Sequence, residues 1–271
     1  MRPPLKWAGG KRALVERIVG LFPEDYRERR YHEPFFGGGA LFFHVRPGGG
    51  SVNDINPRLM NFYRVVRDNP EELIEEASKY RYDEAEYYRL RDRFNSQGLP
   101  TVEDAALFLY LNKTAYNGLY RVNSKGEFNV PFGRYKDPTI VPRRSIRRAS
   151  RLLRNIEIYS MDFAYVLDIA EEGDLCYLDP PYHPASETAN FTDYAVDGFT
   201  LEDQRRLRDI CMELDAMGVT FVLSNSDTEV VRRLYGDVED LIIVPLRTRR
   251  MISSKVSSRA VGHDLLITNC G

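Results

Sequence analysis

The spacing of hydrophobic positions changes along this chain of 271 residues and divides it into three stretches. In the first stretch, apolar residues three and four positions apart alternate with short apolar runs, and these patterns predict helices and buried strands respectively. The expected elements are a helix over residues 10–21, a strand over 31–36, a short helix over 40–45, a strand over 51–55 and a helix that Pro57 opens. This alternation is typical of the first half of a doubly wound α/β fold.

The middle stretch, which begins near residue 69, lacks this alternation. It holds charge-rich helical patterns over 71–81, 83–95 and 102–113, then an aromatic, Asn- and Gly-rich segment over 114–135 with two potential strands around Ser124-Lys125-Gly126. The alternation resumes with strands over 156–160, 174–178, 219–224, 240–244 and 264–268 and helices over 201–217 and 227–235. We therefore predict an α/β domain formed by residues 1–56 and 155–271, with an inserted, mostly helical domain and hairpin over 57–154.

The segment Asp179-Pro180-Pro181-Tyr182 directly follows the apolar run 174–178. Proline lacks an N–H and fixes φ, so the segment is stiff, and the Asp179 carboxylate and the carbonyls of Asp179 and Pro180 are acceptors. Two acceptors, one on each N–H of an exocyclic amine of adenine or cytosine, would draw the nitrogen toward tetrahedral geometry and free its lone pair. Tyr182 offers a ring face on which the base can stack. The alternative is an ordinary turn after a strand.

Glycines occur where the strand over 31–36 gives way to a helix, in the sequence Gly37-Gly38-Gly39. Position 42 is Phe, so the G-x-G-x-x-G pattern and its pyrophosphate site are missing. Asp54, at the end of the second strand, is placed to accept hydrogen bonds from the two hydroxyls of a ribose. A ribose site without a pyrophosphate site favours S-adenosylmethionine over NAD, whereas a tight turn with a helix N-cap is the structural alternative.

The segment before the first expected helix, Lys6-Trp7-Ala8-Gly9-Gly10-Lys11, contains the single tryptophan of the chain. A lone tryptophan is more often part of a core than of a ligand site. The glycines and lysines around Trp7 favour a ligand site here.

Basic residues are concentrated in two segments although the formal net charge is −2. Eight lie between Arg134 and Arg154 against one acid, and five lie between Arg247 and Arg259 with none. Such patches suit a phosphate backbone on one face, although solvated helix faces give the same pattern. The three cysteines lack metal spacing, and no apolar run approaches the ~20 residues that span a bilayer. We therefore expect a cytoplasmic protein with no metal site and no membrane segment.

Taken together, these segments resemble the DNA adenine-N6 methyltransferases of the Dam type, in which the cofactor motif comes first and the target-recognition insertion precedes the catalytic tetrad. The resemblance covers residues 5–11, 33–39, 54–56, 110–112, 116–119, 126–135, 179–182 and 223–225. It implies a Rossmann-like S-adenosylmethionine-dependent methyltransferase sheet with an inserted, mostly helical target-recognition domain. The chain departs from the family at Tyr120, where a small residue is common, and over 249–263.

The resemblance also implies roles for individual residues. S-adenosylmethionine would be bound by Trp7, Lys11, Phe35, Gly37, Gly39, Asp54, Asp162, Phe163 and Asp179. Double-stranded DNA would be bound by Lys6, Tyr116, Asn117, Leu119, Arg121, Pro131, Arg134 and Tyr135. The catalytic residues would be Asp179, Pro180, Pro181 and Tyr182. In such a DNA-binding set, an aromatic ring fills the gap left by an extruded base, Asn bonds the orphaned partner base, and Arg contacts guanine O6 and N7.

These roles imply a site-specific, adenine-specific DNA methyltransferase that flips adenine out of duplex DNA, within GATC, and methylates its N6 amine by direct in-line transfer. We expect a monomer in solution, with or without a cognate restriction endonuclease, and a loop over 249–259 that becomes ordered on phosphate. The alternatives are an RNA or cytosine-N4 amino-methyltransferase, a non-catalytic DNA-binding protein with a decayed pocket, and an NAD-dependent oxidoreductase. The missing third glycine disfavours the oxidoreductase.

Overall fold

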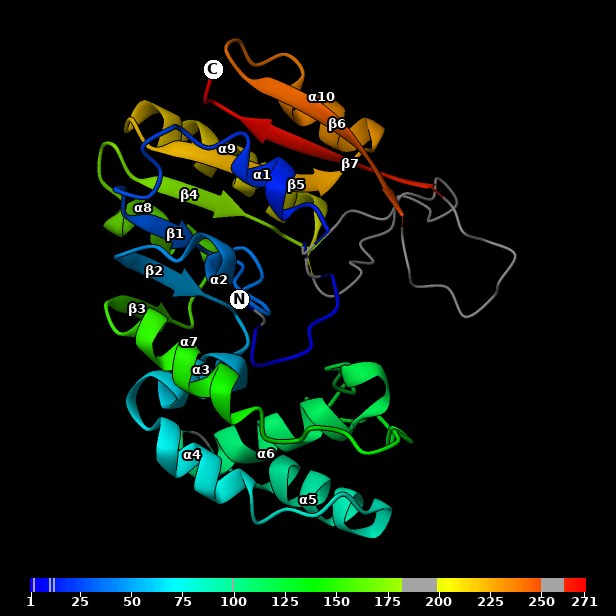
Figure 1. The fold of residues 1–271 in the computed structure, drawn as a ribbon. Helices are drawn as coiled ribbons and strands as arrows, with labels where there is room; N and C mark the ends of the chain where they lie inside the picture. Colours follow the sequence, from blue (N-terminus) through cyan, green and yellow to red (C-terminus); the bar gives the residue numbers. More distant parts are fainter. Residues whose placement is uncertain (2, 10, 12, 99, 182–198, 250–260) are drawn as a thin grey trace. The chain divides into compact units, whose positions relative to one another are not determined.

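The structure is a computed structural model that describes the chain apart from residues 2, 10, 12, 99, 182–198 and 250–260 (Figure 1). The described strands form a mixed, seven-stranded sheet in the order β3-β2-β1-β4-β5-β7-β6, which confirms the predicted α/β class. The chain divides into two compact units. The first comprises Met1–Val15 and Phe36–Asp162, and the second comprises Glu16–Phe35 and Phe163–Gly271.

The second unit contains the strands that lead to the Asp-Pro-Pro segment. These strands are β1 (Tyr31–Glu33), β4 (Leu175–Leu178), β5 (Thr220–Ser226), β6 (Ile242–Arg249) and β7 (Val261–Thr268). β4 is parallel to both β1 and β5, whereas β7 is antiparallel to both β5 and β6. All four residues of β4 are buried, as expected for a parallel strand covered on both faces.

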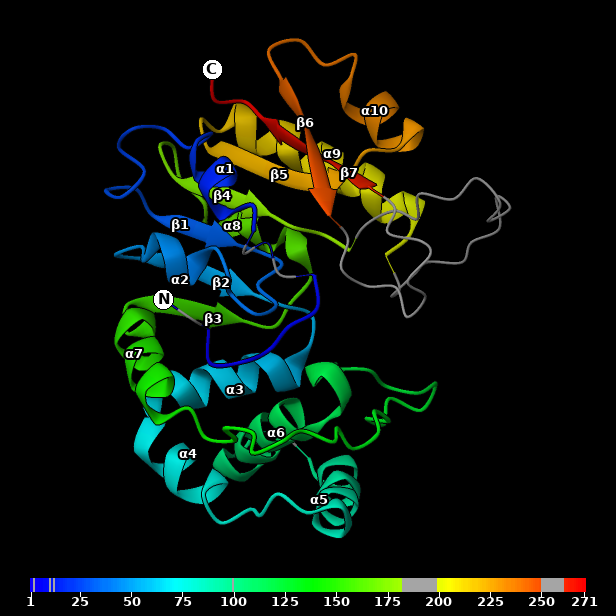
Figure 2. The same ribbon diagram turned by 45° about the vertical axis from the view of Figure 1, so that its right-hand side comes forward.

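Helices cover both faces of these strands. The helical elements of the second unit are α1 (Val15–Val19), η2 (Phe163–Tyr165), α8 (Val166–Ile169), α9 (Leu201–Ala216) and α10 (Glu229–Tyr235). α1 lies on one side of the strands and α9 on the other (Figures 1 and 2). A capping box between Thr200 and Asp203 satisfies the first N–H groups of α9.

The first helix is shorter than the predicted span 10–21. Positions 10 and 12 lie outside the described residues, and the described helix begins only at Val15. Beyond Gly20 the chain continues in tight turns, in which Leu21 N donates to Ile18 O and Phe22 N to Val19 O. Pro23 follows at once, and a residue before proline is disfavoured in helical conformation.

The last two strands are longer than the predicted spans 240–244 and 264–268. Their antiparallel pairing continues past Val244 to the pair of Arg249 with Val261. It includes Pro245, which lies opposite Leu265. β6 is the outermost strand in the sheet order, and edge strands tolerate proline because one row of their N–H groups needs no partner within the sheet.

The first unit holds a parallel strand pair and most of the helices. The strands are β2 (Gly50–Asn53) and β3 (Ile156–Tyr159), and the helical elements are α2 (Phe42–Val45), α3 (Pro57–Asp68), α4 (Pro70–Ala77), α5 (Glu84–Ser96), α6 (Val102–Thr114), η1 (Tyr116–Gly118) and α7 (Arg143–Leu153). α6 packs against α3, α4 and α5, and its residues from Asp104 to Thr114 are all buried. The predicted boundary between 57–154 and the rest of the chain stays a prediction.

α7 was not predicted, because its sequence is dominated by arginine. Ile146, Ala149 and Leu153 nevertheless form a buried stripe with helical spacing. On the exposed side, the Arg147 guanidinium makes two hydrogen bonds of 2.7 Å to the Glu71 carboxylate on α4. Part of the first basic segment therefore holds helices together. None of the described helices is both long and apolar enough to cross a bilayer.

A buried ammonium group lies near the end of α6. Lys113 is only 9% exposed. Burial, together with the nearby charge of Lys6, lowers the pKa of Lys113 to about 8. Because the folded chain holds this proton less tightly than the unfolded chain, the charged lysine opposes folding below that pH.

We expect Lys113→Met to raise the free energy of unfolding near pH 7 by about 1–3 kcal/mol, because it removes this unfavourable buried charge. The gain should shrink as the pH rises from about 8 toward 10, where the native lysine is already neutral in the folded chain. Urea denaturation across this pH range measures both effects. The exposed Lys136→Met is the control and should change little at any pH. A gain that grows with pH would contradict the explanation.

Candidate active site

Asp54 directly follows β2, and both of its carboxylate oxygens accept a backbone hydrogen bond. Oδ2 accepts from Gly37 N at 3.0 Å and Oδ1 from Asn56 N at 2.9 Å. Burial raises the pKa of Asp54, and the two backbone N–H groups act in the opposite direction. The two backbone bonds fix the position of the carboxylate. Each oxygen retains a second lone pair, which can accept a hydrogen bond from a ligand.

Trp7 packs directly on the glycine loop. A Cβ placed on Gly37 would lie 2.8 Å from the indole Nε1, and one on Gly38 would lie 2.7 Å from the Trp7 Cβ. Gly37 also has a φ of +48°, which favours glycine. The glycines therefore accommodate the Trp7 ring and the turn itself. Lys11, further along the same segment, donates from Nζ to Gly9 O at 3.3 Å.

The ends of β2 and β3 bring two predicted acids into the same region of the first unit. The Asn53 side chain donates to Met161 O at 3.1 Å and accepts from Met161 N at 2.8 Å. Asp54 and Asp162 follow these two joined residues, and Asp162 is exposed. Within the described parts of the chain, no three His, Cys, Asp or Glu side chains form a group that could hold a metal ion.

The two predicted phenylalanines of the second unit lie in contact. The ring centroids of Phe35 and Phe163 are 5.3 Å apart, and Phe199 packs against both rings at 5.8 and 5.6 Å. The Arg206 guanidinium lies 4.9 Å from the Phe163 ring centroid, which is a cation–π contact. The three phenylalanine rings therefore form one apolar cluster in which Phe35 and Phe163 contact each other directly.

The Asp-Pro-Pro segment follows β4 directly, with Asp179 partly buried, Pro180 buried and Pro181 exposed. Tyr182, the fourth residue of the predicted tetrad, lies outside the described residues. The Pro181 carbonyl accepts a hydrogen bond from Gln204 Nε2 on α9 at 3.4 Å. Gln204 Oε1 in turn accepts from Asn225 Nδ2 on β5 at 2.9 Å.

Gln204 is a residue that the sequence analysis missed. It is 1% exposed and Asn225 is 0% exposed, so both amides are removed from water and their hydrogen bonds are made within the protein. The motif Leu223-Ser224-Asn225 drew attention to Asn225. No comparable pattern marks Gln204, because a polar residue within an amphipathic helix normally faces solvent. Asn225 on β5 and Gln204 on α9 therefore link strand β5 to the Pro181 carbonyl.

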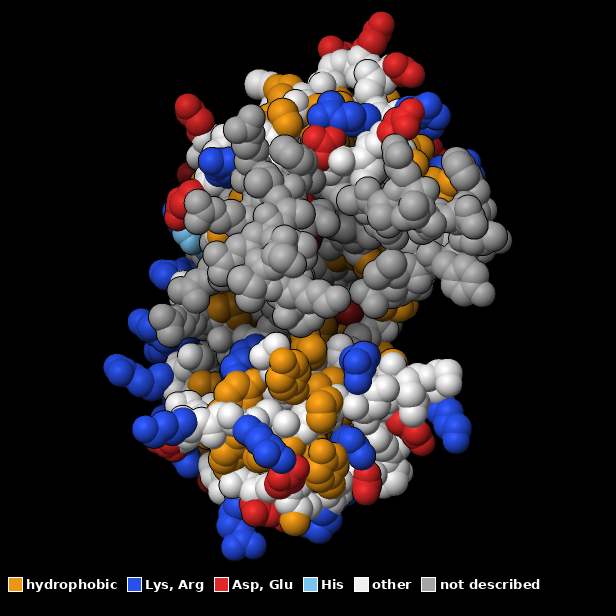
Figure 3. Space-filling view, turned by 90° about the vertical axis from the view of Figure 1, so that its right-hand side faces the viewer, with side chains coloured by type: hydrophobic (Ala, Val, Ile, Leu, Met, Phe, Trp, Pro, Cys, Tyr) orange, Lys and Arg blue, Asp and Glu red, His pale blue; other side chains and the backbone are white. Residues whose placement is uncertain are grey.

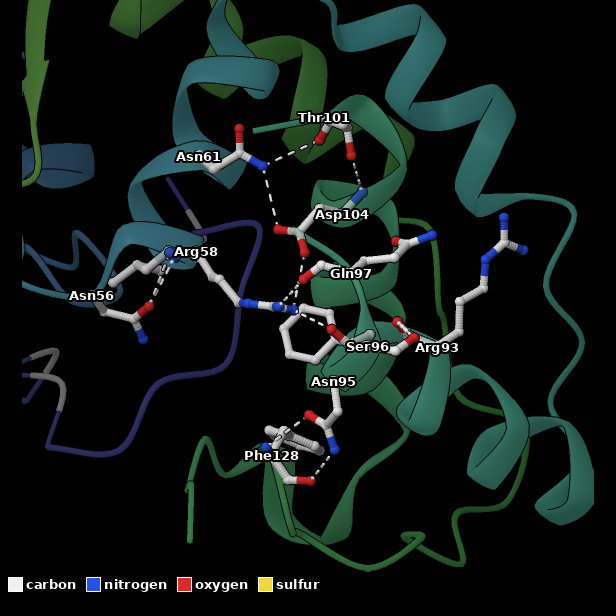
Figure 4. Close-up of polar contacts among 12 residues, drawn as sticks. Asn56, Arg58, Asn61, Arg93, Asn95, Ser96, Gln97, Thr101, Asp104 and Phe128 are labelled. Atoms are coloured by element: carbon white, nitrogen blue, oxygen red, sulfur yellow. Dashed lines mark hydrogen bonds and ion pairs between the residues drawn. The ribbon is translucent and has the colours of Figure 1, made fainter. Parts of the chain in front are cut away.

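The turn predicted around Ser124-Lys125-Gly126 is present, but the two potential strands that flank it are reduced to an isolated antiparallel bridge. Val122 pairs with Phe128 in antiparallel fashion, and Gly126 N donates to Asn123 O at 2.9 Å to close the turn. Asn95 on α5 fastens this hairpin to the helices, since its side chain accepts from Phe128 N at 2.8 Å and donates to Phe128 O at 3.1 Å (Figure 4).

Several predicted DNA-binding residues are exposed near this hairpin. Tyr116 is 55% exposed, and Asn117 beside it has a φ of +54° in a tight turn. Arg121 is exposed, and its Nε donates to Asn129 Oδ1 at 2.8 Å. Pro131 accepts from Tyr116 N at 2.9 Å through its carbonyl. Figure 3 shows Lys and Arg side chains interspersed with hydrophobic ones on this face of the first unit.

The N-terminal segment joins the same group through Lys6. Asn112 on α6 accepts from Lys6 N at 2.9 Å and donates to Lys6 O at 2.7 Å. The Lys6 ammonium lies 4.1 Å from the ring centroid of Tyr135. Leu119 is half-buried, and Arg134 is exposed with Glu84 3.7 Å away. All eight predicted DNA-binding residues therefore belong to the first unit. The predicted loop over 249–259 lies almost wholly outside the described residues.

A mostly parallel sheet with a strand-end acid bonded to a glycine loop is typical of Rossmann-like nucleotide-binding folds. Residues 7–251 match the model of the D12 class N6 adenine-specific DNA methyltransferase, and the chain belongs to this family. The resemblance predicted from the motifs is therefore confirmed. Membership of this family argues against an NAD-dependent oxidoreductase.

Three relatives illustrate the similarity. Over 278 residues the chain is 43% identical to Type II methyltransferase M1.LlaDCHI of Lactococcus lactis subsp. cremoris, with 100% of this chain and 96% of that protein covered. It is 39% identical over 289 residues to Type II methyltransferase M.MjaIII of Methanocaldococcus jannaschii, with 99% of each covered. It is 36% identical over 266 residues to the DNA adenine methylase of Escherichia coli, with 97% of this chain and 93% of that protein covered.

We expect Gln204→Met to slow methyl transfer to DNA by about tenfold to 100-fold, because a small displacement of the proline segment misplaces the groups that hold the substrate. Circular dichroism should show an unchanged secondary structure. Arg205→Met alters the neighbouring exposed position on α9 and should retain the native rate. Equal rates for the native chain and Gln204→Met would show that the Gln204 bond does not position Pro181.

Proposed function

We propose that this chain transfers the methyl group of S-adenosylmethionine to the N6 amine of adenine in duplex DNA, within GATC. The observation that carries the proposal is the Asp-Pro-Pro segment at the end of the buried strand β4, in a chain whose family methylates adenine at N6. The enzyme would act as a monomer.

The side chains of the first unit fit S-adenosylmethionine in their chemistry. The Asp54 carboxylate, held by two backbone N–H groups, can accept from the two hydroxyls of a ribose. Trp7 offers an aromatic surface on the glycine loop, and Lys11 a cation for a carboxylate. When bound, S-adenosylmethionine supplies an electrophilic methyl carbon on a sulfonium sulfur. In the second unit, the rings of Phe35 and Phe163 offer an apolar surface for its adenine.

The target amine would be held by the Asp179 carboxylate and the Pro180 carbonyl. Each would accept one N–H of the adenine amine, which draws the nitrogen toward tetrahedral geometry and frees its lone pair. The nitrogen would then attack the methyl carbon in line as the bond from that carbon to the sulfonium sulfur breaks, and the surplus amine proton would pass to solvent by way of the accepting oxygen. The Asp179 charge also stabilises the positive charge that develops on this nitrogen. The bond from Gln204 supports this geometry because it holds the next carbonyl, that of Pro181.

Duplex DNA would bind to the hairpin face of the first unit, with the adenine flipped out of the stack. The exposed Tyr116 ring can fill the gap that the adenine leaves, and Asn117 can bond the orphaned base. Arg121 has its Nε held by Asn129, which orients the terminal nitrogens for guanine O6 and N7. Lys6 and Arg134 add phosphate contacts, which predicts strongly salt-dependent binding.

The decisive test is mass spectrometry of DNA incubated with the protein and S-adenosylmethionine. N6-methyladenine is expected, together with protection of GATC sites from a restriction enzyme that methylation blocks. Cofactor binding without N6-methyladenine would refute the proposal, and methylation outside GATC would refute the target sequence alone.

Asp179→Ala should lower the methylation rate by about 100-fold or more while leaving the secondary structure intact, because the amine loses a charged acceptor. A fixed-time assay with tritiated cofactor measures the rate. Asp168→Ala removes an exposed carboxylate of the same unit and should retain activity. Turnover by Asp179→Ala at the native rate would rule out the assigned role.

Arg121→Met should reduce discrimination at a single base pair of the target by about tenfold to 100-fold, because a bidentate contact to guanine is lost. Competition binding with single-base variants of the duplex measures this discrimination. Lys125→Met, at the tip of the same hairpin, should instead weaken binding to all duplexes about equally. A uniform loss for Arg121→Met would assign Arg121 to the phosphate backbone.

A further inference from the structure

Tyr120, the position at which the chain departs from its family pattern, lies between the cofactor segment and the hairpin. Its ring is stacked on Trp7, with centroids 5.9 Å apart and an interplanar angle of 22°. It also packs against Phe108 of α6 at 5.4 Å and against Phe128 of the hairpin at 5.6 Å. One side chain therefore contacts a predicted cofactor residue, a helix and the hairpin.

Tyr120 also lies beside Asn56, in the turn that carries Asp54. The Asn56 side chain uses its oxygen to accept from the backbone N–H groups of Arg58 and Leu59, at 3.1 and 3.2 Å. The Asn56 side chain also lies near the Tyr120 hydroxyl, where it partly offsets the burial that raises the pKa of this phenol. Asn56 is two residues from Asp54 and shares a hydrogen bond with its carboxylate.

The same turn is anchored on its other side by Arg58, which makes the link rigid. Arg58 donates to Phe94 O at 2.7 Å and to Gln97 O at 2.8 Å, and pairs with the buried Asp104 at 2.9 Å (Figure 4). Its guanidinium lies 3.8 Å from the Phe94 ring centroid. The turn that carries Asp54 is therefore anchored to α5, to Gln97 after it and to α6.

We propose that Tyr120 is a positioning residue that couples cofactor binding at Trp7 and Asp54 to recognition of the target duplex by its neighbours Leu119 and Arg121. The inference rests on the proposed function. A cofactor that packs on Trp7 would fix the ring on which Tyr120 stacks, and its bond to Asp54 would fix the turn beside which Tyr120 lies. Together these contacts would order the start of the hairpin. By thermodynamic linkage, the bound duplex must then tighten cofactor binding by the same factor.

The test measures the dissociation constant of S-adenosylhomocysteine, which cannot be turned over, with and without the duplex that the native chain methylates. Trp7 is the single tryptophan, so its fluorescence reports occupancy directly. For the native chain we expect the duplex to tighten binding roughly fivefold or more. Tyr120→Leu, which loses ring and hydroxyl, should bring this factor close to one, and Tyr120→Phe, which loses only the hydroxyl, should give an intermediate factor.

Phe132→Leu is the matched control. Phe132 is a half-buried aromatic residue of the same segment, but its ring contacts Tyr82 and Tyr87 instead of Trp7. It should retain the native factor. The proposal is overturned if the duplex does not tighten cofactor binding to the native chain. It is also overturned if both Tyr120 variants keep the tightening factor of the native chain, or if Phe132→Leu loses it. If Tyr120→Leu fails to fold, Tyr120→Phe decides alone. A native chain that binds no S-adenosylhomocysteine would instead refute the proposed function.

Discussion

The hydrogen bond between Gly37 N and the Asp54 carboxylate is the contact on which the arrangement of the first unit depends. It joins the glycine loop to the end of β2, and this loop supports the Trp7 ring. Tyr120 stacks on Trp7 and leads into the hairpin, near which several predicted DNA-binding residues are exposed. The Asp54 carboxylate thus helps to place side chains far from it in sequence, because it holds the glycine loop, the loop supports Trp7, and Trp7 supports Tyr120.

Amide side chains make several of the other connections between segments. Asn53 joins β2 to the end of β3, Asn95 joins α5 to the hairpin, and Asn112 joins α6 to the N-terminal segment. In the second unit, Asn225 and Gln204 extend the same principle to Pro181. An amide both donates and accepts, so it satisfies two backbone groups of an irregular segment at once, without the desolvation cost of a charge.

Much of this organisation is evident from the sequence, and the failures have physical causes. The buried strand β4, the glycine loop and the hairpin turn are governed by local patterns, which the sequence contains in full. α7 was overlooked because arginines outnumber the three apolar residues that pack inward. The extensions of β6 and β7 depend on mutual pairing rather than on either segment alone. Gln204 and Tyr120 make their contacts with segments distant in sequence, which no local pattern records.

Pro245 in the outermost strand has a consequence for how the enzyme behaves at high concentration. A sheet edge with a full row of N–H donors and carbonyl acceptors is a template on which a strand from another molecule can add. Pro245 deprives β6 of one donor midway along its length. Among the described strands β6 is the outermost, and the missing donor makes its edge a poorer template for a strand from another molecule.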